Sequence, residues 1–134
     1  MKPVRKIDTI ISSLTAAYTQ RCQALFQAVR QYMPRGTEVW GGQGGFFAWV
    51  GLPEGIFAAE VVALAAKEGV VVASGGMSEC PGEQNRLGWA ERWIRVSVSY
   101  CEADEITEGI KRLGDASDRW CAGERAGETD VDVR

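Results

Sequence analysis

The sequence predicts an α+β domain in which helices cover a small mixed or antiparallel sheet. Two long amphipathic patterns, at residues 7–33 and 102–121, enclose several short runs of branched and aromatic residues. A period of 3.6 residues indicates a helix, whereas alternation or a short apolar run indicates a strand. The resulting order is helix, strand, strand, helix, strand, strand, helix, which is typical of helices packed on one sheet.

The first helix is predicted over residues 7–33, because apolar side chains recur there at helical spacing. Pro34 and Gly36 end it, since proline cannot donate the backbone hydrogen bond of a helix and disfavours helical conformation in the residue before it. The apolar positions are Ile7, Ile10, Ile11, Leu14, Tyr18, Cys22, Leu25, Phe26, Val29 and Met33.

The middle of the chain predicts two strands, a helix and a third strand. Residues 39–40 and 46–52 flank a glycine cluster, and the aromatic and branched content of 46–52 is typical of a strand buried on both faces. The alanine-rich residues 56–67 indicate a helix that ends at Gly69. The branched run at 70–73 follows directly and predicts a short strand.

The last third of the chain predicts a loop, a strand and a helix. Residues 74–91 are rich in glycine and polar residues and are long for a loop, which indicates a functional or mobile segment. Residues 93–100 alternate, and 102–121 open with acidic residues that complement a helix dipole. The alternation places Ile94, Val96, Val98 and Tyr100 on one face of the strand, and Trp93, Arg95, Ser97 and Ser99 on the other.

The length of 134 residues predicts one domain, at residues 1–121. The remaining residues, 122–134, have charges and glycine but no periodicity, so they are expected to form a disordered tail. An apolar fraction of 46% and a charged fraction of 25% are ordinary for a water-soluble protein, and no membrane partner is expected.

Charge and residue types exclude several function classes. A net charge of −3 with scattered basic residues gives no field that would attract nucleic acid. The four cysteines are far apart, which predicts neither a disulfide framework nor a metal site but reduced thiols in the cytoplasm. The chain has no histidine, so the commonest general base is missing. The glycine cluster at 41–45 lacks the lysine and hydroxyl residue of a phosphate-binding loop and indicates a turn.

A family resemblance covers most of the chain, from residue 18 to 114. Its motifs are YTQR at 18–21, YMP at 32–34, GGFFAWVGLPEG at 44–55, EGV at 68–70, IRVSVS at 94–99 and EITEGIKRL at 105–113. In this order they resemble the carboxy-terminal small domain of the class I and II (fold-type I) aminotransferases, which depend on pyridoxal phosphate. The resemblance implies the small-domain fold of that family.

The resemblance also implies a substrate-binding residue. In the family the arginine of the closing strand binds the substrate α-carboxylate, and this role carries over to Arg95. A planar, permanently charged guanidinium suits a carboxylate better than a lysine does. Ser97, Met77 and Trp93 are further candidates for substrate binding. Residues 74–77 read SGGM where the family usually has a Pro-Gly pair and an aromatic residue, so substrate specificity does not carry over.

The cofactor machinery of the family has no counterpart in the sequence. The family binds pyridoxal phosphate through a lysine, an aspartate and a phosphate-binding turn in a large domain. None of Lys2, Lys6, Lys67 and Lys111 has the sequence context of that lysine. We therefore expect no cofactor in this chain alone, and pyridoxal phosphate only where a large domain is supplied in trans.

Three functions remain open at this point. The first is a stand-alone, truncated transferase domain derived from an enzyme of amino acids and 2-oxo acids, which does not transaminate alone. The others are a cofactor-independent enzyme acting on a carboxylate-bearing substrate and an effector-binding regulatory module. Without the resemblance, Arg95 is an ordinary surface arginine. The sequence singles out no catalytic residue. The expected partners are a small carboxylate or amino-acid-like ligand and either a second copy, as a homodimer, or a separate large domain.

Overall fold

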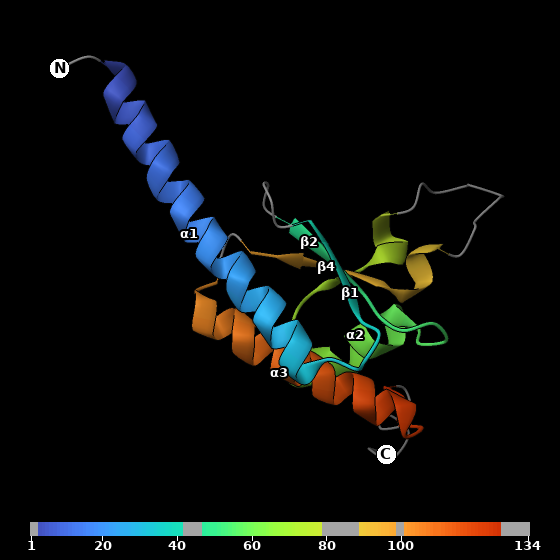
Figure 1. Ribbon diagram of the computed structural model, residues 1–134. Coiled ribbons are helices and arrows are strands. Elements are labelled where there is room, and N and C mark those ends of the chain that lie inside the picture. The colour runs from blue at the N-terminus through green and yellow to red at the C-terminus, as the bar shows by residue number, and fades with distance from the viewer. Residues whose placement is uncertain (1–2, 42–46, 79–88, 99–100, 127–134) are drawn as a thin grey trace.

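A computed structural model describes residues 3–41, 47–78, 89–98 and 101–126. The order of its helices and strands is the one that the sequence predicts, and the α+β fold class is confirmed (Figure 1). The elements are α1 (Pro3–Tyr32), β1 (Glu38–Gly41), β2 (Phe47–Gly51), α2 (Ala58–Lys67), β3 (Ala73–Ser74), the 3₁₀ turns η1 (Gly75–Ser78) and η2 (Trp89–Arg92), β4 (Trp93–Ser97) and α3 (Ala103–Cys121).

The four strands form one antiparallel sheet in the order β1-β2-β4-β3. One row of paired residues crosses the sheet from edge to edge: Trp40 pairs with Trp49, Trp49 with Arg95, and Arg95 with Ala73. Directly paired residues project from the same face of a sheet. These four side chains therefore share one face, and Arg95 lies in the middle of that row.

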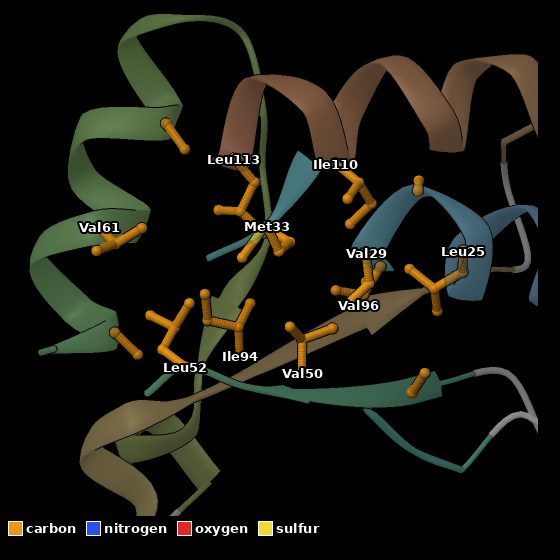
Figure 2. Close-up of a cluster of buried hydrophobic side chains, with 14 of the residues drawn as sticks. Leu25, Val29, Met33, Val50, Leu52, Val61, Ile94, Val96, Ile110 and Leu113 are labelled. Atoms are coloured by element: carbon orange, nitrogen blue, oxygen red, sulfur yellow. The ribbon is translucent and has the colours of Figure 1, made fainter. Parts of the chain in front are cut away.

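The core fills the space between the helices and the other face of the sheet. In Figure 2 the inward side chains of β2 and β4 point toward the three helices, which all lie on that side. Val50 and Ile94 are completely buried there, together with Leu25 of α1, Val61 of α2 and Leu113 of α3. Because all three helices lie on this side, no described helix covers the opposite face, which carries Arg95. We call it the open face.

Two strand predictions were wrong. Strand β2 is not buried on both faces, because Ala48 and Val50 face the core while Phe47 on the open face is 47% exposed. The strand expected at residues 70–73 is reduced to Ala73–Ser74. The amide of Val70 donates instead to the carbonyl of Ala65, which closes the end of α2 around a left-handed Gly69. That cap uses the amide that a strand would need.

The first third of α1 extends beyond the rest of the domain (Figure 1). Contact with the start of α3 begins near Arg21, whose guanidinium donates to the carbonyl of Val98 at 3.3 Å and to Glu102 at 3.4 Å. Four large apolar side chains before that point are each at least half exposed, namely Ile7, Ile10, Ile11 and Leu14. We call these four residues the α1 stripe. No described helix is long and apolar enough to span a membrane.

The C-terminal end is attached to α2 and α3. Arg119 pairs with Glu124 at 2.6 Å, and the Lys67 ammonium donates to the carbonyl of Ala126 at 2.7 Å. The guanidinium of Arg125 stacks on the ring of Trp120 at 4.3 Å. These contacts extend the packed unit to Ala126. Residues 127–134 of the expected tail lie outside the described residues, so their disorder stays a prediction.

Candidate functional site

Arg95 is positioned by the strand that carries it. Its neighbours Ile94 and Val96 are buried in the core, which fixes the pleat of β4 and directs Arg95 to the open face. Arg95 itself is half-buried, between Trp49 on β2 and Ala73 on β3. A long charged side chain is thus held by a rigid strand with its head toward the open face.

The guanidinium of Arg95 stacks on an aromatic ring. Its central carbon, Cζ, lies 4.7 Å from the centroid of the Phe47 ring. Phe47 pairs with Ser97, so the arginine head leans toward the Ser97 end of β4. A stacking contact restrains the plane of the guanidinium but uses none of its N–H donors.

Arg95 differs from the other half-buried arginines of the described residues in having no carboxylate partner. Each of the others pairs with a glutamate; these pairs are Arg21–Glu102, Arg92–Glu38, Arg119–Glu68, Arg119–Glu124 and Arg125–Glu60. Within the described residues Arg95 forms no ion pair and donates no hydrogen bond, and its guanidinium stacks on Phe47. No described residue therefore occupies its donors, which suit an anionic ligand.

Some of the other predicted site residues lie on the same face of the sheet as Arg95. Trp93 and Ser97 share its face of β4. The Trp93 ring packs over Gly51, where an added Cβ would lie 2.7 Å from it, and Arg92 stacks on the same ring at 5.0 Å. Trp93 thus has a packing role. Ser97 is half-buried and has an interaction of its own. Met77 belongs to η1, but its side chain lies outside the described residues.

A groove elsewhere on the domain is a poorer place for a carboxylate. It has a volume of about 640 Å³ and lies between α3 and the segment that precedes β3. Its wall includes the acidic side chains Asp104, Glu105 and Glu108, and its one basic residue, Arg112, already binds Glu108 and the carbonyl of Glu68. Like charges repel. The groove therefore disfavours an anion, whereas the open face at Arg95 favours one.

The described lysines are placed away from Arg95. A site for pyridoxal phosphate needs a lysine beside the bound substrate. The described lysines, Lys6, Lys67 and Lys111, are exposed on the three helices, and none lies on the open face of the sheet. No described lysine is therefore placed to bind the cofactor next to Arg95.

Sequence reasoning missed Phe47 as the neighbour of Arg95. The spacing of Phe47 and Trp49 by two residues indicates that they share a face of a strand. Their alignment with Arg95 depends on the register between β2 and β4, which are far apart in sequence. Treating residues 47–51 as an alternating strand, rather than as a strand buried on both faces, would have placed Phe47 and Trp49 together on the exposed face.

These features define a one-sided α+β domain that presents an arginine on the open face of its sheet. Residues 6–113 match the family model "Aminotransferase class I and II". An uncharacterised protein of Saccharomyces cerevisiae is 35% identical over 105 residues, which are 78% of this chain and 23% of that protein. The 2-aminoadipate transaminase of Thermus thermophilus is 31% identical over 99 residues, or 74% of this chain and 23% of that enzyme.

The fold is also found in a solved structure. The multiple substrate aminotransferase of Thermococcus profundus superposes with a TM-score of 0.74 at 26% identity, covering 87% of this chain and 28% of that one. The chain belongs to the class I and II aminotransferase family, which depends on pyridoxal phosphate. It spans about a quarter of the length of the curated relatives that it matches.

Proposed function

We propose that this chain acts as the small domain of an aminotransferase and that Arg95 binds the carboxylate of an amino acid or 2-oxo acid. The observation that carries the proposal is the half-buried guanidinium of Arg95, which is stacked on Phe47 and has no carboxylate partner among the described residues. Two parallel N–H donors of an arginine match the two oxygens of a carboxylate. Holding one end of the substrate orients its reacting carbon.

A large domain, in the same polypeptide or supplied in trans, provides the pyridoxal phosphate in this proposal. Two surfaces of the domain support it. The open face of the sheet exposes Trp40 by 64% and Phe47 by 47%, and the α1 stripe is exposed where α1 extends beyond the start of α3. Contiguous apolar surface is usually covered by a partner. The match to about a quarter of each curated relative leaves the remaining three quarters for such a partner.

Binding of a small carboxylate to the purified chain tests the role of Arg95. Pyruvate and L-alanine are titrated while the Nε–Hε signal of Arg95 is followed by NMR. We expect saturable binding that Arg95→Ala weakens about tenfold or more, because hydrogen bonds to a charged group are worth about 1.5–3 kcal/mol. The control is Arg30→Ala, which removes one exposed positive charge from α1. Equal losses in both variants would show nonspecific charge attraction and contradict the proposal.

Addition of pyridoxal phosphate tests the need for a large domain. Because no described lysine lies on the face of Arg95, the chain should not increase the rate at which pyridoxal phosphate and L-alanine form pyruvate, relative to the same mixture without protein. Transamination should begin only when a large-domain polypeptide of the family is added. Turnover by the chain alone would contradict the division of roles. Tight binding that a large domain does not increase would favour an effector-binding module instead.

A further inference from the structure

Among the described residues, the side chain of Phe47 takes no part in the packing of the core. It is the first residue of β2, it is 47% exposed, and it does not belong to the hydrophobic core or to the residues packed against it. The side chains that follow it on β2 alternate between the two faces of the sheet, and Ala48 lies in the core. In the described part of the chain the ring of Phe47 contacts the guanidinium of Arg95. The role of Phe47 therefore concerns Arg95.

The sheet geometry brings the two side chains together diagonally. The direct partner of Arg95 on β2 is Trp49, and Phe47 is two residues further along the same strand. Diagonal neighbours across an antiparallel pair are about 7–8 Å apart at Cα, which long and aromatic side chains can span. Trp49 therefore flanks the stem of Arg95, while Phe47 contacts its head.

Stacking restrains the guanidinium without occupying its N–H donors, whereas an ion pair occupies them. An arginine side chain has several rotatable bonds, and a carboxylate ligand must find its planar fork in one orientation. A glutamate partner would fix the fork but occupy its donors, as Glu38 and the carbonyl of Leu52 do for Arg92. An aromatic ring restrains the same plane through its face and leaves the N–H donors at the edge available.

We propose that Phe47 is a positioning residue that holds the guanidinium of Arg95 ready for a carboxylate. The consequence for ligand binding rests on the proposed function of Arg95. Stacking alone does not define such a site, because Arg92 also lies over an aromatic ring, that of Trp93 at 5.0 Å, with its donors engaged elsewhere. The combination of a stacked plane and uncommitted donors distinguishes Arg95.

The test compares Phe47→Leu, Phe47→Tyr and a matched control in the full chain. The control is Phe57→Leu, because Phe57 is 48% exposed and contacts Trp120 rather than Arg95. NMR gives the chemical shift of the Arg95 Nε–Hε signal, which a ring at 4.7 Å perturbs, and titration with pyruvate gives the affinity. Thermal melting shows whether each variant is folded.

Phe47→Leu should remove the ring-induced shift and weaken pyruvate binding about two- to fivefold, the range expected for an exposed cation–π contact. Phe47→Tyr should restore both, because its ring face is equivalent. All variants should melt as folded proteins, since Phe47 lies outside the core. Phe57→Leu should leave the Arg95 signal and the affinity unchanged.

Two outcomes overturn the inference in distinguishable ways. If the wild type binds pyruvate and Phe47→Leu binds it equally well, Phe47 does not position Arg95, although the proposed function stands. If the wild type binds neither pyruvate nor L-alanine, the proposed function fails, and the binding role of Phe47 fails with it.

Discussion

Gly114 of α3 lies directly against the backbone carbonyl of Tyr32 at the end of α1. A Cβ at Gly114 would collide with that carbonyl oxygen. The carbonyl belongs to the backbone of α1, and the added Cβ is attached directly to the backbone of α3, so the two helices would have to move apart. Overpacking of this kind costs about 1–3 kcal/mol. We therefore expect Gly114→Ala to lower the free energy of unfolding by that amount, measured by urea denaturation.

Gly109 provides a control on the same helix. A Cβ added at Gly109 would meet nothing within 4 Å. Alanine in place of glycine within a helix stabilises it by about 0.5–1 kcal/mol. Gly109→Ala should therefore raise the midpoint of unfolding while Gly114→Ala lowers it. Similar effects of the two substitutions would mean that the close contact between α1 and α3 is absent in solution.

The pair Arg119–Glu124 makes stability at the C-terminal end depend on pH. Two hydrogen bonds from Arg119, at 2.6 and 2.7 Å, are the main cause of a lowered pKa of the Glu124 carboxyl. The stabilisation is therefore present above the unfolded-state pKa of glutamate, about 4.3, and is lost as the pH falls through the lower folded-state pKa.

We expect Glu124→Gln to lower the melting temperature slightly at pH 7, because the pair is partly exposed. The difference from the wild type should disappear in acid below the folded-state pKa of Glu124. Glu54→Gln serves as the control, since Glu54 is exposed and has no ion pair among the described residues. A difference that grows on acidification would contradict the assigned sign.

The α1 stripe should make the isolated chain self-associate. Its four apolar side chains lie at helical spacing and form one exposed surface. In sedimentation velocity the wild type should form a homodimer as its concentration rises. The double variant Ile10→Ser, Ile11→Ser should shift it toward the monomer with an unchanged free energy of unfolding, because both residues are exposed.

Val71→Ser is the matched control for the stripe. Val71 is 90% exposed but lies outside the stripe, in the segment before β3. Its substitution should leave association unchanged. A wild type that stays monomeric at high concentration would refute self-association, and equal effects of Val71→Ser and the double variant would assign it to general apolar exposure.

The sequence by itself determined the order of the elements and the direction of Arg95. Helical and alternating periods are local features of a sequence. They therefore predict α1, α3 and the alternation of Ile94, Arg95 and Val96 without any knowledge of packing. The same alternation placed Arg95 opposite the core. The family motifs then supplied its expected role, and the match at residues 6–113 agrees with that family.

Only the tertiary structure decided what surrounds Arg95. The register between β2 and β4, which brings Phe47 to the guanidinium, joins segments far apart in the chain and leaves no local periodic signal. β2 is open on one face because all three helices pack on the other, and the amide of Val70 closes α2 instead of extending β3. Local patterns fix which way a side chain points along its own element, whereas its neighbours depend on contacts between distant elements.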